Sequence, residues 1–289
     1  MKKAASVLGR VFLGFILFLT LVPFYLLLSN SFKWSEEIVK KPFTLPAEWH
    51  FTNYAKSVVQ VIHPMANTLL VTICVIVIVL IVGTLAAYTF VRFHFKGSTF
   101  LYLAIMALLM IPGFVLLIPQ FIQITRLQMY NTFWGLIFPP AAASSATATF
   151  LLRTSMEGLS KSLFEAADME GAGDLQILTK IVVPLSKPTI STVTIMTGLS
   201  AWNNYLWPLV STTGENTQQI AVALTKLVRS SVEGNGIMFA GYVTASLPLI
   251  LLFCFASKSF VSGLTPVSYT HLYQRIREMN LRKAAIEEA

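Results

Sequence analysis

The sequence predicts an all-α integral membrane protein, a helical bundle that crosses the membrane six times. Of its 289 residues, 55% are hydrophobic and only 12% are charged, a composition too apolar for a soluble domain. Mean hydropathy is +0.69. A spanning helix needs about 20 mostly apolar residues. The runs that meet this length lie at 11–29, 67–91, 100–125, 133–152, 189–210 and 237–260.

Lysine and arginine residues favour alternate loops, which assigns the bundle an orientation. With the N-terminus in the cytoplasm, 14 of the 21 lysine and arginine residues fall on the cytoplasmic side, as the positive-inside rule requires. Four of the 14 lie in a C-terminal tail, and without them the bias is 10 of 17. The sequence predicts a multi-pass inner-membrane protein with both termini in the cytoplasm. The net charge of +8 therefore reflects topology and not a nucleic-acid partner.

The first apolar run follows Lys2, Lys3 and Arg10, as the core of a secretory signal does. It is longer than a usual signal core and no small-x-small cleavage site follows it, which favours an uncleaved anchor. Both cysteines, Cys74 and Cys254, lie inside apolar runs and are interpreted as small hydrophobic residues. We expect no disulfide, no metal site and no cofactor.

Two of the other runs contain residues that shape a helix. Pro112 and Pro119 each remove a backbone hydrogen bond and are expected to bend the third span. The fourth run is rich in small residues at 139–149, which predicts close helix packing at the bundle centre or at a partner interface. Outside the membrane, the external loop 32–64 contains Trp34 and Trp49, apolar residues on which it can fold.

The most specific segment is a polar interruption between the fourth and fifth runs, on the predicted cytoplasmic side. Ser162 and Glu165 have the spacing of a capping box, which predicts a helix that begins near Leu163. This helix is expected to end at Gly171 or Gly173, since glycine takes the left-handed conformation easily.

A second helix is expected directly after the glycines, with Asp174 as its cap. The sequence thus predicts a helix, a glycine turn and a second amphipathic helix along the cytoplasmic surface. Its apolar face would be formed by Leu175, Leu178, Ile181 and Val182, and its end would be set by Pro184 and Pro188.

The order of residues in this segment resembles the EAA loop of bacterial ABC importer permeases. Glu-Ala-Ala at 165–167 is followed after three residues by Gly171, and then by Ile181-x-x-Pro184. The nearest group is the carbohydrate permeases of the MetI-like permease fold, which include the second permease of the maltose transporter. Glu170 replaces the usual Asp, and Val183 the usual Leu, both with similar chemistry. The resemblance implies that an ATPase subunit docks on Glu165, Ala166, Ala167, Asp168, Glu170, Gly171, Ala172, Ile181 and Pro184. Periodicity alone fits an interfacial connector on lipid headgroups equally well.

The resemblance covers about residues 11–265 and also implies partners and domain limits. The partners would be two copies of an ATPase subunit, a second homologous permease, an extracytoplasmic solute-binding protein and membrane lipid, with alternating access as the mechanism. A permease domain at 11–265, with its coupling loop at 154–188, would follow a cytoplasmic N-terminus at 1–10. Because the chain contains no G-x-x-x-x-G-K-[ST] motif, ATP hydrolysis is expected on another polypeptide and the chain is not expected to be an enzyme.

The spans offer neutral polar groups rather than charges. Apart from their ends, the six runs contain no charged residue or histidine, although ionisable groups usually mark ion pathways. Residues 201–208 resemble the W-N-x-x-L-W-P signature of carbohydrate permeases, and Trp202 and Tyr205 are expected to share a helix face. An aromatic belt with interhelical amide contacts explains the same residues almost as well. The expected solute path contains Gln120, Gln123, Trp202, Asn203, Asn204 and Tyr205.

The tail at 266–289, which follows a family-like Gly-Leu-Thr, has two interpretations. Leu272, Ile276, Met279 and Ile286 have the spacing of an amphipathic basic helix that lies on the membrane or against the ATPase. Residues 266–272 also resemble translated sequencing-adapter read-through, in which case the tail is not native.

Other classes of function remain open at the level of the sequence. One is an ATP-independent secondary transporter, and another is an ABC permease for a polyol or glycerol phosphate. An intramembrane enzyme is disfavoured, because the spans lack a Ser/His pair, an H-E-x-x-H motif and paired carboxylates. Whether uptake requires ATP or an ion gradient separates the two transporter classes.

Overall fold

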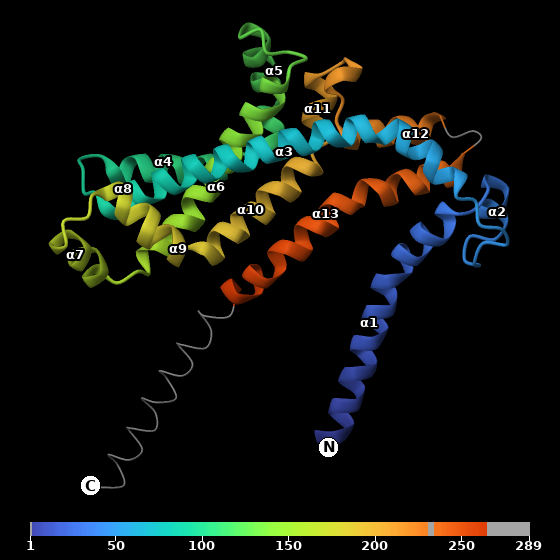
Figure 1. Cartoon of the computed structure of the whole chain (residues 1–289), viewed down its shortest axis with the longest axis horizontal. Coiled ribbons are helices and arrows are strands. Elements are labelled where there is room, and N and C mark those ends of the chain that lie inside the picture. The colour runs from blue at the N-terminus through green and yellow to red at the C-terminus, as the bar shows by residue number, and fades with distance from the viewer. Residues whose placement is uncertain (1, 231–233, 265–289) are drawn as a thin grey trace. The chain divides into compact units, whose positions relative to one another are not determined.

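The computed structural model describes residues 2–230 and 234–264, and every regular element within them is helical (Figure 1). The tail at 266–289 and its two interpretations lie outside the described residues. The α-helices are α1 (Lys2–Ser31), α2 (Ser35–Lys40), α3 (Thr52–Arg92), α4 (Ser98–Leu109), α5 (Leu117–Arg126), α6 (Phe133–Glu157), α7 (Lys161–Met169), α8 (Asp174–Ile177), α9 (Val183–Leu185), α10 (Lys187–Trp202), α11 (Leu206–Ser211), α12 (Ile220–Ser230) and α13 (Asn235–Leu264). Short 3-10 turns lie at Gly113–Leu116 and Glu215–Thr217, and a π-helix lies at Leu178–Val182.

Four of the described helices are long and apolar enough to cross a membrane. They contain the segments Gly9–Ser31, Thr52–Arg92, Phe133–Glu157 and Asn235–Cys254, and the pair α4 and α5 raises the number to five if it is one broken span. The predicted run at 189–210 is divided between α10 and α11, which residues 203–205 separate. The all-helical membrane fold is thus as predicted, while the number of six spans stays a prediction.

The third predicted run bends at the first of its two prolines. α4 ends at Leu109, and the chain resumes helical structure at Gly113 with a change of direction of 96°. Pro112 lies between them with an extended backbone, because proline cannot continue the backbone hydrogen bonds of α4. The predicted bend is confirmed at Pro112 but not at Pro119, which lies in the first turn of α5.

The second predicted run begins earlier than expected. α3 starts at Thr52, so the helix includes residues 52–66, which the sequence analysis assigned to the external loop or left unassigned. Pro64 lies inside this extension. This extension is polar, with Lys56 and His63 among its residues, and a search for apolar runs therefore ends near Asn67. The irregular part of the external loop is correspondingly shorter than predicted.

The chain divides into two compact units, which are described separately. Among the described residues, unit 1 comprises 2–70, 130–133, 202–230 and 234–249, and unit 2 comprises 71–129, 134–201 and 250–264. In unit 1, Phe32 contacts the rings of Trp49, Phe51 and Tyr54 at centroid distances of 5.0, 5.3 and 5.0 Å. The external loop folds on these aromatic rings.

Lys33 is fully buried beneath this loop. Its Nζ donates to the backbone carbonyl of Lys41 at 2.9 Å, and Asn53 Nδ2 donates to the carbonyls of Ser31 and Lys33, each at 3.0 Å. Burial lowers the pKa of Lys33 from its ordinary value of 10.5, and the nearby carboxylate of Glu37 opposes this shift. The carbonyls of Lys41 and Pro42, at 2.9 and 3.4 Å from Nζ, supply the partners that a buried ammonium requires.

In unit 2, the small residues of α6 allow the close packing that the sequence predicts. A Cβ atom added to Gly83 on α3 would lie 2.8 Å from the Cβ of Ala148 on α6. The most apolar window of α6 is 44% buried, compared with 33% or less for the other three spanning helices. α6 therefore occupies the centre of unit 2.

Candidate coupling site

The segment between α6 and α10 forms two short helical arms joined by a glycine turn, and all of it belongs to unit 2. The first arm, α7, begins at Lys161 with Ser160 as its N-cap. The predicted capping box is wrong. No side chain caps α7 in the described part of the chain; the hydroxyls of Ser160 and Ser162 bond to each other at 2.7 Å instead, and Glu165 is exposed.

The turn after α7 is centred on Gly171, one of the two glycines named by the sequence. Its φ is +73°, the left-handed conformation that glycine adopts without strain. Gly171 N–H donates to the carbonyl of Asp168 and Ala172 N–H to that of Ala167, both at 3.0 Å. These two bonds form a Schellman motif, which satisfies the last carbonyls of α7. The glycine turn is therefore confirmed at Gly171.

The second arm begins differently from the prediction. Gly173 is the N-cap of α8 and Asp174 is its first residue, with no side-chain cap in the described structure. The Asp174 carboxylate accepts hydrogen bonds from the Tyr88 hydroxyl at 3.1 Å and from Arg92 Nε at 3.3 Å, both on α3. Asp174 thus binds side chains of α3 instead of capping its own helix. The spacing of residues in the sequence does not indicate this contact.

One face of the two arms is buried against unit 2. It contains Phe164 and Ala167 of α7 together with Ile177, Leu178 and Val182 of the second arm. The predicted apolar face is correct for Leu178 and Val182 but wrong for Leu175, which is 71% exposed. The opposite face carries exposed Glu165, Ala166, Met169 and Glu170.

Pro184 does not end the second arm. α8 passes through the π-helix Leu178–Val182 into α9, and the helical path breaks only at Ser186, before α10 begins at Lys187 with Pro188 in its first turn. Pro184 has no N–H for the carbonyl of Lys180, and the wider π-helix occupies this stretch. A π-turn inside a helix is often found at functional positions.

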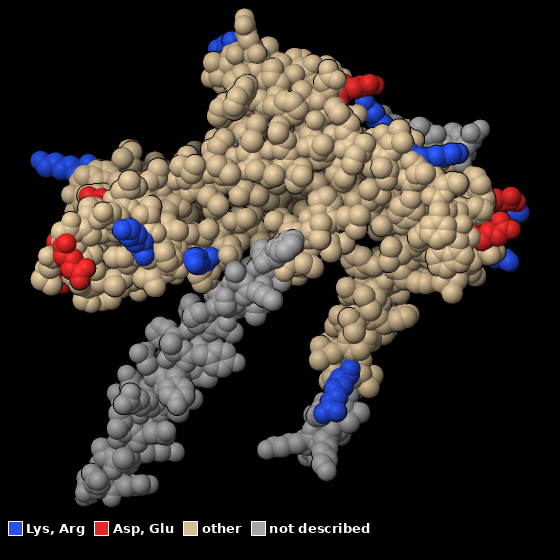
Figure 2. All heavy atoms as spheres, viewed as in Figure 1, with Lys and Arg blue, Asp and Glu red and all other residues tan. Residues whose placement is uncertain are grey.

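The exposed part of the arms is acidic. Figure 2 shows acidic side chains gathered at the α7 end of unit 2. Asp168 pairs with Arg92 at 2.6 Å, whereas Glu165 and Glu170 have no ion pair within the described residues. These two carboxylates are thus available to a partner.

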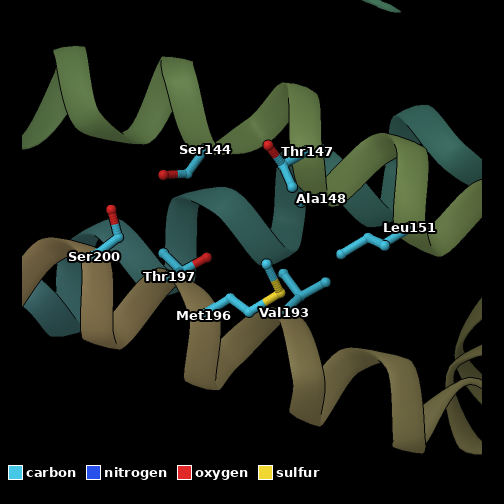
Figure 3. A pocket seen from close by; sticks show the side chains of 8 residues that line it. All are labelled: Ser144, Thr147, Ala148, Leu151, Val193, Met196, Thr197 and Ser200. Atoms are coloured by element: carbon cyan, nitrogen blue, oxygen red, sulfur yellow. The ribbon is translucent and has the colours of Figure 1, made fainter. Parts of the chain in front are cut away.

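A second feature of unit 2 is a groove between α6 and α10 (Figure 3). Its volume is about 150 Å³, and none of the side chains that line it is charged. Ser145 and Thr149 of α6 donate to the carbonyls of their own helix. In contrast, four hydroxyls that line the groove make no hydrogen bond in the described part of the chain: those of Ser144, Thr147, Thr197 and Ser200.

The residues predicted for the solute path fall in different places. Gln120 and Gln123 of α5 line a cavity of about 260 Å³ in unit 2, together with Phe138 of α6. The Trp202 side chain belongs to unit 1 and packs in an apolar cluster with Val61 and Ile220.

The predicted helix face shared by Trp202 and Tyr205 is wrong, because α10 ends at Trp202. Asn204 Oδ1 accepts a hydrogen bond from the N–H of Trp207 at 3.3 Å, in the first turn of α11. Contact of any of these residues, or of Asn203, with a solute stays a prediction.

Comparison with known protein families identifies the chain. Residues 79–266 match the family described as "Binding-protein-dependent transport system inner membrane component". This is well over half of the chain. The chain belongs to this family. It is therefore the membrane component of a transport system, in agreement with the resemblance of its EAA loop.

Relatives of this inner membrane component are permeases of several transport systems. The AraQ permease of an arabinooligosaccharide transport system in Halalkalibacterium halodurans is 30% identical over 258 residues, which cover 87% of this chain and 92% of that protein. The NgcG permease of a diacetylchitobiose uptake system in Streptomyces coelicolor is 29% identical, with 82% and 80% covered. A bacterial ABC transporter involved in alginate import has a chain of similar structure, with a TM-score of 0.80, 26% identity, and 89% and 97% covered.

Proposed function

We propose that this inner membrane component is a permease subunit of an ABC importer that carries a sugar or oligosaccharide into the cytoplasm. ATP would be hydrolysed by separate subunits, since the chain has no P-loop motif. The observation that carries the proposal is the two-armed segment 161–182. Its buried face fixes it to unit 2, and its other face leaves Glu165, Met169 and Glu170 exposed at a defined glycine turn.

This arrangement suits a mechanical contact with a moving partner. A rigid turn with small Ala166 on its exposed face permits close approach, and the free carboxylates of Glu165 and Glu170 favour a basic surface on the partner. The proposed partners are two ATPase subunits on the cytoplasmic side and a second, homologous permease. Both termini would then lie in the cytoplasm, as the distribution of lysine and arginine predicts.

A carbohydrate cargo is supported by two observations. Arabinooligosaccharide and diacetylchitobiose systems contain relatives of this chain over most of its length. The α6–α10 groove also offers four free hydroxyls and no charge, which suits hydrogen bonding to a neutral, hydroxyl-rich solute. A relative in an sn-glycerol-3-phosphate system of Brucella abortus, 28% identical, supports a polyol phosphate as the second candidate.

Reconstitution of the complete transporter in proteoliposomes tests the proposal. Neutral oligosaccharides and sn-glycerol-3-phosphate would be supplied with the cognate binding protein, with ATP inside the vesicles or with an imposed ion gradient alone. We expect uptake of a neutral oligosaccharide that requires ATP and survives collapse of all ion gradients. Uptake driven by an ion gradient without ATP would establish a secondary transporter, and selective uptake of the phosphate ester would establish the second candidate.

A further inference from the structure

Arg92, the last residue of α3, contacts both arms of the coupling segment. Its Nη2 lies 2.6 Å from Asp168 Oδ1 on α7, and its Nε lies 3.3 Å from Asp174 Oδ1 on α8. Its Cζ also lies 5.8 Å from the ring centroid of Phe164 on α7. The Tyr88 hydroxyl, one turn earlier on α3, donates to the same Asp174 oxygen at 3.1 Å.

These contacts depend on the glycine turn. Asp168 and Asp174 are six residues apart, and on a continuous helix they would lie on different faces. They meet one guanidinium because the chain reverses at Gly171, whose φ is +73°. Arg92 can therefore bind both carboxylates only in one particular geometry of the two arms, and it stabilises that geometry.

We propose that Arg92 is a positioning residue for coupling, which holds α7 and α8 at a fixed angle and ties both to the end of α3. The proposal rests on the proposed function, because it assigns a role in transmitting the movement of the ATPase. Without this tie, the exposed bend is connected to the rest of unit 2 through its buried apolar face, the hydrogen bond from Tyr88 to Asp174 and its two chain connections, to α6 and α10. With it, α7 as well as α8 is tied to α3, so a displacement of either arm also moves this helix of 41 residues.

The chemistry of the side chain suits this role. A guanidinium is a planar fork whose separate N–H groups can serve two carboxylates at once, whereas a lysine ammonium is a single point of charge. The Arg92 side chain is 24% exposed, and those of Asp168 and Asp174 are 44% and 51% exposed. Ion pairs this exposed are individually weak. Loss of Arg92 should therefore impair coupling without unfolding the protein.

The first test measures coupling in the complete transporter. Arg92→Gln should lower the number of oligosaccharide molecules taken up per ATP hydrolysed by about threefold to tenfold, the range expected when a pair of half-exposed ionic contacts is lost. Arg92→Lys should restore part of the loss. The matched control is Arg153→Gln, since Arg153 pairs with Glu157 on its own helix at 2.8 Å and stacks on Tyr102. The control should keep the wild-type ratio.

A merely structural role would give a different pattern. In that case Arg92→Gln would reduce the amount of assembled transporter, while each assembled complex would keep its ratio of uptake to hydrolysis. That result would overturn the positioning role and leave the proposed function intact. If the wild-type transporter itself shows no ATP-dependent uptake, the proposed function fails instead.

The second test observes the arms directly and does not require transport. Spin labels would be attached to Met169→Cys and Leu175→Cys, which are 85% and 71% exposed on either side of the turn, in a chain with Cys74 and Cys254 replaced by alanine. The full-length protein in lipid nanodiscs should show a narrow distribution of label distances in continuous-wave electron paramagnetic resonance. Arg92→Gln should broaden this distribution, and an unchanged distribution would contradict the proposed tie.

Discussion

Replacement of Gly171 tests the turn on which the coupling segment is built. The φ of +73° is left-handed, and within the described residues no atom other than those of its chain neighbours lies within 4 Å of the position where a Cβ would be added. The effect of a substitution is therefore a backbone effect and not a clash. An L-residue in this conformation costs about 1–2 kcal/mol, which corresponds to a loss of about fivefold to thirtyfold in the population of the turn.

The chain offers a matched control two residues later. Gly173 has an extended backbone with φ of −72°, and it also has open space around its Cβ position. Gly171→Ser should uncouple ATP hydrolysis from uptake, and Gly171→Val should do so more strongly, because a β-branched residue tolerates a positive φ least. Gly173→Ser should be neutral, since serine is a favoured N-cap. All three variants should insert normally, as judged by yield from the membrane fraction.

The assay compares solute-stimulated ATP hydrolysis with uptake in proteoliposomes of the complete transporter. Equal coupling in the wild type and in Gly171→Val would refute the reasoning, because the turn geometry would then not matter for transport. An equal loss in Gly171→Ser and Gly173→Ser would also refute it, since side-chain bulk rather than backbone conformation would be the cause.

Three further predictions concern packing and charge. Gly83→Leu should destabilise the detergent-solubilised protein by about 1–3 kcal/mol, because even the leucine Cβ would lie 2.8 Å from the Cβ of Ala148. The change is measured as the temperature of thermal aggregation. An unchanged temperature would argue against this packing. Burial lowers the pKa of Lys33 from 10.5, so the folded protein binds this proton less tightly than the unfolded chain, and the free energy of unfolding should rise with pH toward 10.5. Lys33→Met should remove this rise. A Lys33→Met variant with the same pH dependence as the wild type would exclude Lys33 as the source of the rise. Trp202→Ala should lower the free energy of unfolding by about 3–5 kcal/mol through loss of its buried contacts. Tyr205→Ala should instead change uptake and leave stability unchanged. If Trp202→Ala changed uptake without loss of stability, Trp202 would contact the solute.

Features governed by local rules were predictable from the sequence. The bend at Pro112 follows from the chemistry of proline, and the turn at Gly171 follows from the freedom of glycine at positive φ. The small residues of α6 indicated close packing because bulk limits the distance between helices. In these three cases a property of the residue type indicated the structure, although Pro184 shows that a proline does not always end a helix.

Features decided by contacts between distant residues were not predictable. The spacing of Asp174 after a glycine predicts a helix cap, yet its carboxylate binds Tyr88 and Arg92, which lie more than 80 residues earlier. The only signal for Arg92 was its place among basic residues at the end of an apolar run, which indicated a cytoplasmic boundary and no partner. Likewise, the start of α3 at Thr52 escaped detection because a helix that continues beyond the apolar run has a polar sequence there.

The central claim is that the exposed face of the two-armed segment 161–182 docks on an ATPase subunit, and site-specific photo-cross-linking tests it most directly. A photoreactive amino acid would replace Met169, which is 85% exposed on α7, and Phe100, which is 74% exposed on α4, as the control. In cells that express the whole transporter, we predict that position 169 forms a cross-link to the ATPase subunit and that position 100 does not. An active transporter in which position 169 cross-links only to lipid, or to no protein, would contradict the account.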